Sequence, residues 1–498
     1  MSPSIHSINE EHPSAFINGQ WKNGEGKFFT SSSPADNKTL WKGKETNSAQ
    51  VDEAVAAAQD AFKSWSPLPV EERAACLERY KEILKAHQEE LALLISEETG
   101  KPLWDSKNEV SSMVGKIPLT LESYRARCNE LLRENPQGVS MTRHRPHGVV
   151  GVLGPFNFPG HLPGGHIVPA LLAGNTVIFK PSELTPRVAE EVMHYWEQAL
   201  LPAGVLNLVQ GGKKTGQALV THPGIQGLFF TGSYQTGLYL SKFFGSFPDK
   251  ILALEMGGNN PLIVSQINDI KASAYLAIQS AYLSSGQRCT CARRLIVPKG
   301  KTGDEFITVF LEMAKTILTG RPSDKPEPFM GPVITDKQAV TLLESQALLQ
   351  SKGGRPLLEM KSSSLGINFL SPGLMDVTEV EGLPDEENFG PFLQLIRPSN
   401  FIEAVNEANK TKFGLAAGLF SSNEEEYRYF YENVRAGIVN WNTQLTGASS
   451  AAPFGGVGCS GNHRPSAYYA VDYCAYPVAS METTQIMMPA QLHPGITL

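Results

Sequence analysis

Cysteine and long apolar runs are both scarce in this chain, and each absence excludes a class of protein. Six cysteines are scattered over 498 residues, a usage typical of reduced thiols in the cytosol and not of a disulfide-stabilised secreted protein. Cys289 and Cys291 are two positions apart, which is not zinc-ligand spacing, so we expect no metal site. No run of about 18 apolar residues occurs, so we expect no membrane span.

An excess of positive charge is lacking as well. The chain has 43 Lys and Arg residues against 50 Asp and Glu, which gives a net charge of −7. Nucleic-acid-binding proteins need a basic face, so we expect no nucleic-acid partner. Residues 1–11 lack a basic region followed by an apolar one, so we expect no signal peptide and a cytoplasmic location.

The composition that remains is globular, with 41% hydrophobic and 19% charged residues. The length allows two or three domains at roughly 150 residues each. Apolar residues at helical spacing predict structural helices at 48–65, with Ser48 as the cap, and at 70–98. A third helix with a weaker pattern is expected at 106–134.

From residue 148 onward, short apolar runs alternate with helix-length segments, and a second such region begins near residue 260. The alternation predicts two α/β regions with parallel strands covered on both faces. The expected strands of the first region are 148–155, 175–180, 205–210, 227–231 and 251–255. Residues 443–464 are expected to form a long loop, and 467–480 a strand that pairs within the chain or with another subunit. Sheets of this type bind ligands at the carboxyl ends of their strands.

Cys289 lies in a glycine-led turn between an expected helix at 269–282 and an expected strand at 294–297. Three cations flank it, namely Arg288, Arg293 and Arg294. Nearby cations lower the pKa of a thiol and favour the nucleophilic thiolate. From this turn alone, a nucleophile and a buried small hydrophobe are equally good interpretations.

Polar side chains follow several of the expected strands. Asn157 offers an amide that suits an oxyanion, or else it forms an Asx-type turn beside proline. Lys180 and Glu183 suit the phosphate and ribose hydroxyls of a dinucleotide, or else they form a solvated charge pair. Glu255 suits a general base, although an isolated Glu is more often a surface residue. Glu387 suits a ribose contact or simply shapes its loop.

Residues 227–237 predict a strand, a Gly-Ser turn and the start of a helix. Backbone amides at such a helix start suit a pyrophosphate. The spacing from Gly232 to Gly237 departs from the usual G-x-G-x-x-G pattern, so this turn alone is weak evidence for a dinucleotide site.

Seven motifs, in this order, resemble the aldehyde dehydrogenase superfamily over nearly the whole chain. They are Phe156-Asn-Phe-Pro159, Lys180-Pro-Ser-Glu183, Phe230-Thr-Gly-Ser233, Glu255-Met-Gly-Gly-Asn-Asn-Pro261, Gly286-Gln-Arg-Cys289, Glu387-Asn-Phe-Gly-Pro391 and Pro453-Phe-Gly-Gly-Val457. Within the superfamily, residues 154–163, 286–294 and 460–477 are most similar to the branch that oxidises a succinylated glutamate semialdehyde in arginine catabolism. Each motif is weak alone, but the ordered set is specific.

The resemblance implies a covalent mechanism, in which one difficult step becomes two easier ones. Cys289 would be the nucleophile, Asn157 and the Cys289 amide would hold the oxyanion, and Glu255 would activate water to hydrolyse a thioester. NAD would accept the hydride. The implied cofactor-binding residues are Pro155, Phe156, Lys180, Ser182, Glu183, Gly232, Ser233, Gly237, Glu387 and Phe389. The implied substrate-binding residues, for a small acidic aldehyde, are Thr290, Thr446, Gly447, Ala448, His463 and Arg464.

The resemblance also implies an α/β fold with three parts and a homodimer or homotetramer. Residues 1–125 and 146–254 would form a Rossmann-type NAD domain, 255–466 an α/β catalytic domain, and 126–145 with 467–498 a small β oligomerisation element. The chain departs from many family members at Phe156 and Asn259, where Trp and Lys are common, but neither departure removes a group that the mechanism needs.

Several alternatives stay open at this stage. The carboxylate of Glu183 would repel a 2′-phosphate, so NAD is expected over NADP. A dehydrogenase that passes its thioester to coenzyme A is disfavoured by Glu255, which that chemistry does not need. A non-catalytic protein on the same fold is disfavoured by the intact set of Cys289, Glu255 and Asn157. The exact aldehyde and the role of Cys291, as a bystander or a strained disulfide partner, are left undecided.

Overall fold

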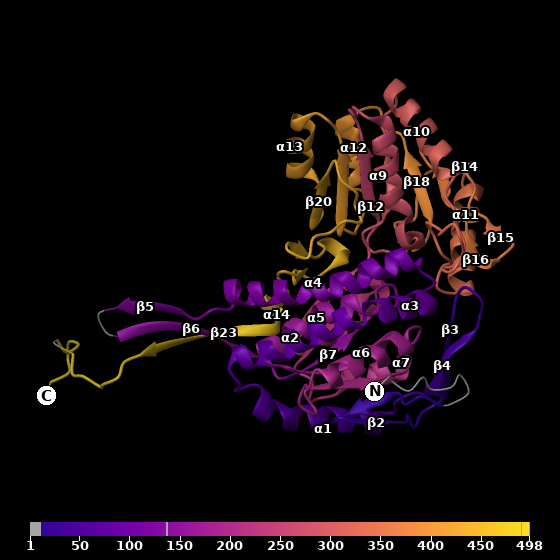
Figure 1. The fold of residues 1–498 in the computed structure, drawn as a ribbon. Helices are drawn as coiled ribbons and strands as arrows, with labels where there is room; N and C mark the ends of the chain where they lie inside the picture. The colour runs from indigo at the N-terminus through magenta and orange to yellow at the C-terminus, as the bar shows by residue number, and fades with distance from the viewer. Residues whose placement is uncertain (1–10, 136–137, 490, 498) are drawn as a thin grey trace.

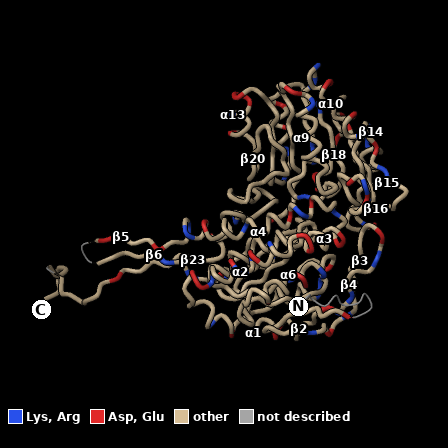
Figure 2. The backbone as a smooth tube through the Cα atoms, in the orientation of Figure 1, with Lys and Arg blue, Asp and Glu red and all other residues tan. Residues whose placement is uncertain are grey.

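A computed structural model describes residues 11–135, 138–489 and 491–497, and it consists of two α/β bodies and a projecting arm (Figure 1). The first ten residues, for which no signal peptide is expected, lie outside the described residues. Basic and acidic residues are interspersed over both bodies (Figure 2). In the described part of the chain, no helix is both long and apolar enough to cross a membrane.

The first body is built on a seven-stranded sheet of order β11-β10-β7-β8-β9-β1-β2. Its strands are β1 (Ala15–Ile17), β2 (Gln20–Lys22), β7 (Val149–Leu153), β8 (Thr176–Lys180), β9 (Leu206–Val209), β10 (Gly227–Gly232) and β11 (Ile251–Met256). Strands β7 to β11 are parallel, whereas the β1–β2 hairpin closes one edge in antiparallel fashion. All five strands expected in this region are confirmed to within a few residues.

Most helices of the first body come from the part of the chain before residue 245 (Figure 1). They are α1 (Ser48–Trp65), α2 (Val70–Ala86), α3 (Gln88–Thr99), α4 (Leu103–Arg127), α5 (His161–Ala173), α6 (Pro186–Gln198), α7 (Lys213–Thr221) and α8 (Tyr234–Phe244). Buried aliphatic and aromatic side chains from both sheet and helices form one large core, which includes Leu77, Val152, Leu171 and Trp196. The expectation of a parallel sheet packed against helices is confirmed here.

Three helix expectations in this body are wrong in detail. Asn47, not Ser48, caps α1, because its side chain accepts a hydrogen bond from the Gln50 amide. The helix expected at 70–98 is two helices, since His87 leaves helical geometry between α2 and α3. The helix expected at 106–134 begins at Leu103 and ends at Arg127, after which the chain enters strand β5 (Leu131–Asn135).

The second body carries another seven-stranded sheet, of order β14-β17-β18-β13-β12-β19-β20. Its strands are β12 (Asn260–Val264), β13 (Ala292–Ile296), β14 (Arg355–Leu358), β17 (Gly373–Asp376), β18 (Phe392–Ile396), β19 (Ala416–Phe420) and β20 (Ile438–Trp441). Its helices are α9 (Ile270–Tyr282), α10 (Lys301–Ala314), α11 (Asp336–Ser351), α12 (Phe401–Ala408) and α13 (Glu424–Asn433). All but β14 pair in parallel, which confirms the second α/β region.

Smaller pieces complete the bodies. The hairpins are β3 (Phe28–Ser32) with β4 (Thr39–Lys44), β15 (Ser362–Ser363) with β16 (Gly366–Leu370), and β21 (Pro453–Phe454) with β22 (Ser466–Ala467). Short 3-10 turns occupy Leu283–Gly286 and Gly458–Ser460. The helix α14 (Ala470–Cys474) packs against α4 and α5, so the chain returns to the first body after it has built the second.

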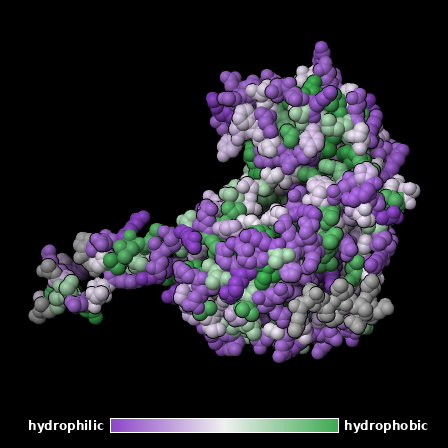
Figure 3. All heavy atoms as spheres, in the orientation of Figure 1, coloured by the Kyte–Doolittle hydropathy of each residue, from purple (hydrophilic) through white to green (hydrophobic). Residues whose placement is uncertain are grey.

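The arm is a three-stranded antiparallel sheet that projects from the first body (Figure 1). It contains β5, β6 (Gly138–Pro146) and β23 (Ala475–Glu482). The strand expected at 467–480 therefore begins only at Ala475, because α14 takes the residues before it. Strand β23 pairs with β6 of its own chain along its full length. Apolar side chains remain exposed on the arm (Figure 3). Leu131, Leu132 and Met481 are among the exposed large hydrophobic residues.

Candidate active site

Cys289 follows a tight turn between α9 and β13. Ser284 and Ser285 both adopt left-handed backbone conformations, with φ of 53° and 56°, which cost energy for residues other than glycine. Two hydrogen bonds hold them: Ser284 Oγ donates to Asp105 Oδ2 at 2.5 Å and Ser285 Oγ donates to the Gly331 carbonyl at 2.7 Å. The turn that presents the thiol is therefore strained and fixed from outside.

The arginines around Cys289 are engaged by other partners. Arg288 pairs with the buried carboxylate of Asp105, with Nη2 2.6 Å from Oδ1. Arg293 donates to the carbonyls of Gly286 and Gly390 at 2.7 and 3.2 Å. Arg294 donates to three further backbone carbonyls, those of Asn259, Glu407 and Ala408.

The expectation that these cations would lower the pKa of the Cys289 thiol is wrong. The pKa of this thiol is raised to about 12, chiefly by burial and to a smaller extent by the carboxylates of Glu387 and Glu255, and the opposing effect of Arg293 is too small to reverse the shift. The arginines of this turn thus stabilise its conformation and do not lower the pKa of the thiol below its usual value. Cys291 is buried as a free thiol, with Sγ 3.8 Å from the Leu283 carbonyl oxygen.

Asn157 lies in the loop after β7, which also contains Pro155 and Phe156. Its Nδ2 donates a hydrogen bond to the Gln287 carbonyl at 2.9 Å, which joins this loop to the Cys289 turn. A primary amide has two hydrogens, so this bond leaves one for another acceptor. The side chain is only 8% exposed, and the sequence-derived alternative of an Asx turn is replaced by a contact between the two bodies.

Glu255 is the next-to-last residue of β11 and pairs with Gly461 of the 453–466 loop. Its Oε2 has no hydrogen-bond partner among the described residues, and the side chain is buried. A Cβ placed on Gly455 would lie 3.0 Å from Oε1, so glycine permits the loop to approach this closely. Burial raises the pKa of Glu255 well above its usual value, against a smaller opposing effect of the Ser466 amide. The surface-residue interpretation of Glu255 is therefore wrong.

Glu387 supplies a second buried carboxylate. Its Oε1 lacks a hydrogen-bond partner within the described chain and lies 3.7 Å from Arg293 Nη2. Burial raises the pKa of Glu387 to about 7. A Cβ on Gly257 would lie 1.8 Å from Oε2, so only glycine fits there. Nearby, the rings of Phe389 and Phe156 meet edge to face with centroids 6.0 Å apart.

The expected cofactor residues of the first body lie at the ends of β8 and β10. Lys180 is buried, donates to the Pro181 carbonyl at 2.7 Å and lies 3.8 Å from exposed Glu183. Burial lowers the pKa of Lys180. Ser182 Oγ accepts from the Leu184 amide at 3.2 Å.

The Gly-Ser turn forms as expected at the start of α8. Gly232 ends β10, and Ser233 caps the helix by accepting a hydrogen bond from the Thr236 amide. Gly237 packs against Met256, whose Sδ would lie 2.2 Å from an added Cβ. This glycine therefore allows the helix to lie close to the end of β11.

The expected substrate residues are not one cluster of free polar groups. Thr290 is buried, and the hydroxyl of buried Thr446 donates to the Gln279 carbonyl at 3.2 Å. Gly447 and Ala448 are exposed in the long loop. His463 and Arg464 are exposed as well, and the Arg464 guanidinium donates a hydrogen bond to the His463 carbonyl at 3.2 Å. No ion pair of Arg464 is found with any described acid.

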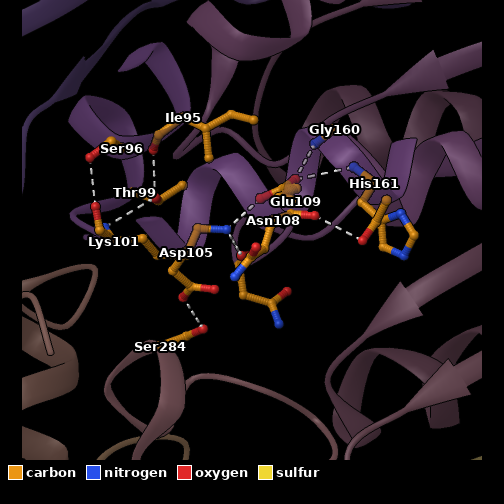
Figure 4. A network of polar contacts seen from close by, with 12 residues as sticks. Ile95, Ser96, Thr99, Lys101, Asp105, Asn108, Glu109, Gly160, His161 and Ser284 are labelled. Atoms are coloured by element: carbon orange, nitrogen blue, oxygen red, sulfur yellow. Dashed lines mark hydrogen bonds and ion pairs between the residues drawn. The ribbon is translucent and has the colours of Figure 1, made fainter. Parts of the chain in front are cut away.

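Helix α4 supplies functional positions that sequence reasoning missed (Figure 4). Asp105 holds Ser284 and Arg288 of the Cys289 turn. One turn later, Glu109 Oε1 accepts from the amides of Gly160 and His161 at 3.0 and 3.1 Å. The same helix thus anchors the Cys289 turn and the Asn157 loop. Acidic residues on the apolar stripe of a helix were the signal in the sequence.

Lys101, just before α4, completes this network. Its ammonium forms an ion pair with Glu109 and donates to the Asn157 carbonyl at 3.0 Å. It also lies 4.1 Å from the ring centroid of Phe158. Lys101 and Glu109 are both almost fully buried, so this pair holds the Asn157 loop in addition to the contact with Gln287.

Known proteins resemble this chain throughout its length. Residues 21–477 match the aldehyde dehydrogenase family. An N-succinylglutamate 5-semialdehyde dehydrogenase from Ectopseudomonas mendocina is 55% identical, with 97% of this chain and 99% of that protein covered. The P. syringae indole-3-acetaldehyde dehydrogenase AldA, solved as a mutant in complex with NAD+ and IAA, is 30% identical over 95% of this chain and 96% of its own, with a TM-score of 0.88. A Thermus 1-pyrroline-5-carboxylate dehydrogenase with bound NAD is 27% identical over 95% and 93%, also with a TM-score of 0.88. The chain belongs to the aldehyde dehydrogenase family.

Proposed function

We propose that this protein oxidises N-succinylglutamate 5-semialdehyde to N-succinylglutamate, with NAD as the hydride acceptor, in arginine catabolism. The observation that carries the reaction class is the junction of the two bodies, where Asn157 is hydrogen-bonded to the turn that presents Cys289. The substrate rests on the 55% identity to a protein of that name over almost the full length of both chains.

The residues present fit NAD. Ser233 and the first amides of α8 form a helix N-terminus suited to the pyrophosphate. Lys180 and Glu183, next to Ser182, would hold the adenosine ribose. Glu387, whose Oε1 has no hydrogen-bond partner among the described residues, would accept from the nicotinamide ribose. Phe156, Pro155 and Phe389 would flank the nicotinamide. When bound, NAD supplies a two-electron acceptor for the hydride.

In the proposed mechanism, Cys289 Sγ forms a bond to the aldehyde carbon and its proton passes to a base. The free hydrogen of the Asn157 amide and the Cys289 backbone amide hold the resulting oxyanion. After oxidation, the substrate is a thioester on Cys289. Glu255 then takes a proton from water, the hydroxide adds to the thioester carbon, and the C–S bond breaks to give the acid. Burial raises the pKa of Glu255, which makes it a stronger base when ionised.

The same proposal assigns a role to each of the three parts of the chain. Residues 1–125 and 146–254 would bind NAD and 255–466 would carry the nucleophile. The arm and tail, 126–145 and 467–498, would join subunits of a cytoplasmic homodimer or homotetramer. Exposed Leu131, Leu132 and Met481 support the last role, because a partner would cover them. Light scattering would give the oligomeric state, and a monomer would remove the role of the arm.

The test is NADH formation with N-succinylglutamate semialdehyde beside glutamate semialdehyde, succinate semialdehyde and an aliphatic aldehyde. We expect a large kcat/KM preference for the succinylated compound. Turnover of the others without it would leave a dehydrogenase but exclude this substrate. Formation of an acyl-CoA when coenzyme A is added would favour the acylating alternative, and binding of NAD without any turnover would favour a non-catalytic protein.

A further inference from the structure

Lys116 is a buried cation without a counterion. It lies in the middle of α4 with 8% of its side chain exposed. Within the part of the chain that the structure describes, its ammonium has neither an ion pair nor a side-chain hydrogen bond. Burial lowers the pKa of Lys116 to about 8, and no acid lies close enough to oppose the effect. An unpaired buried charge is costly. A bound anion would offset that cost for the Lys116 ammonium.

The cations near this face of α4 outnumber the carboxylates, and Lys116 is the cation that has no acidic partner among the described residues. Lys101 is paired with Glu109, and Arg288 is paired with Asp105. Three cations therefore face two carboxylates, and Lys116 is the unmatched one. The sequence gives no hint of this imbalance, because it depends on which residues share the face of one helix.

Helix α5 leaves room around this ammonium. A Cβ on Gly165 would lie 2.9 Å from Lys116 Nζ, so the lysine occupies the space that a side chain would fill there. A Cβ on the neighbouring Gly164 would meet no heavy atom within 4 Å. Helix α5 also contacts β22, which follows the long loop over Glu255. Glycine at 165 therefore lets the Lys116 ammonium lie against α5, and glycine at 164 places no side chain beside it.

His161 adds a second unsatisfied group. Its Nδ1 is buried and has no hydrogen-bond partner among the described residues. The pKa of His161 is well below its usual value because of burial and the nearby cations Lys116, Lys101 and Arg288. A neutral imidazole beside a lysine offers an N–H donor next to a positive charge, which suits a carboxylate.

We propose that Lys116 and His161 form an anion subsite that binds a carboxylate of the substrate remote from its aldehyde. The inference rests on the proposed function and specifies how its acidic substrate is selected. Lys116 lies seven residues after Glu109, which is about 10 Å along the helix axis at 1.5 Å per residue. Glu109 anchors the loop of Asn157. An extended N-succinylglutamate semialdehyde spans about 10 Å from aldehyde to succinyl carboxylate.

The test compares Lys116→Met with Lys107→Met. Lys107 is a matched control, since it is a partly exposed lysine of the same helix, paired with Glu89 at 2.6 Å. In K116M, KM for N-succinylglutamate semialdehyde should rise roughly 10- to 100-fold, the loss expected for a charge-assisted hydrogen bond. The kcat/KM for an uncharged aliphatic aldehyde should stay unchanged, and K107M should match the wild type with both.

Stability provides a second readout. Removal of an uncompensated buried cation should raise Tm in K116M, whereas loss of a structural contact would lower it. If K116M does not fold, inhibition of the wild-type enzyme tests the subsite instead. As a competitive inhibitor against the aldehyde, N-succinylglutamate should have an inhibition constant at least tenfold lower than that of its analogue with a neutral amide at the succinyl end. Equal inhibition by both, or equal loss with charged and uncharged aldehydes in K116M, would overturn the subsite.

Failure of the subsite and failure of the proposed substrate give different results. If the wild type prefers another acidic aldehyde, the substrate assignment fails, but K116M should still raise KM for that compound alone. If the wild type prefers N-succinylglutamate semialdehyde and K116M leaves its KM unchanged, the function stands and the subsite is excluded.

Discussion

The Asn157 side chain donates a 2.9 Å hydrogen bond to the carbonyl of Gln287, two residues before Cys289. The bond joins a loop of the first body to the turn of the second that presents the thiol. The amide proposed to hold the oxyanion and the nucleophile that creates it are therefore fixed relative to each other by one short contact, although 130 residues separate the bonded pair in the chain.

Replacement of Asn157 by alanine should lower kcat by about 100- to 1,000-fold, the effect of removing one oxyanion donor. Steady-state NADH formation would measure it, with fluorescence titration of NAD as the control for cofactor binding. Unchanged kcat in a folded N157A enzyme would contradict the role of the amide.

Replacement of Glu387 by glutamine should lower the pKa of the Cys289 thiol, because the Glu387 carboxylate is one of the charges that raise it to about 12. A shift of half to one pKa unit would increase the alkylation rate at pH 9 by about three- to tenfold. Iodoacetamide labelling followed by mass spectrometry measures the rate at Cys289. Slower labelling in E387Q would contradict the electrostatic account.

Glu255→Gln should stop turnover after the first oxidation, because the thioester then lacks a base to activate water. Rapid mixing should show a burst of NADH close to one equivalent per active site, followed by a slow phase. In the wild type, the pKa of Glu255 is raised by burial, so kcat should fall on acidification at a pH well above the usual range of a carboxylate. A steady state without a burst in E255Q would place the rate-limiting step elsewhere.

Asp105 and Glu109 are expected to act as positioning residues. Asp105→Asn and Glu109→Gln each weaken an anchor of one loop, so kcat should fall about tenfold or more, while KM for NAD changes little. Slower alkylation of Cys289 in D105N would show that the turn has moved. Glu122→Gln, at an exposed position of the same helix, is the matched control and should behave as the wild type. Equal losses in all three variants would indicate a general effect on α4.

Glu183 is expected to select NAD over NADP. Its exposed carboxylate would repel a 2′-phosphate, so Glu183→Gln should improve kcat/KM for NADP several-fold. The same change should lower kcat/KM for NAD, because the carboxylate would also hold the adenosine ribose. Initial rates with both cofactors measure the ratio. Equal efficiency of the wild type with NAD and NADP would overturn this expectation.

The sequence predicted the five parallel strands of the first body well, because buried parallel strands form continuous apolar runs such as those that became β7 and β8. It did not predict β14 and β17 of the second body. It missed the break at His87, since the apolar stripe continues from Leu84 to Leu91 across the kink. It also predicted helix where β5 lies, because an exposed strand of the arm has no buried face to give an alternating pattern.

At the site, the motifs placed Cys289, Asn157 and Glu255 near strand ends, but local reasoning gave the wrong direction for the thiol pKa. The arginines stand beside Cys289 in the sequence, whereas Asp105, which pairs with Arg288, is 183 positions away. Lys116 was overlooked for a similar reason. A lysine in a helix is usually solvated, and only the packing of α4 on α5 buries this one.

The arm sets an order of events during synthesis. Strand β6 lies in the first third of the chain and β23 near its end, and β23 pairs with β6 along its full length. A nascent chain on the ribosome presents β6 with one side unpaired until residue 482 has emerged. Any partner that recognises the finished three-stranded ribbon therefore meets only completed chains, and a truncated product lacking the last few dozen residues would be excluded from assembly and left with an open strand edge prone to aggregation.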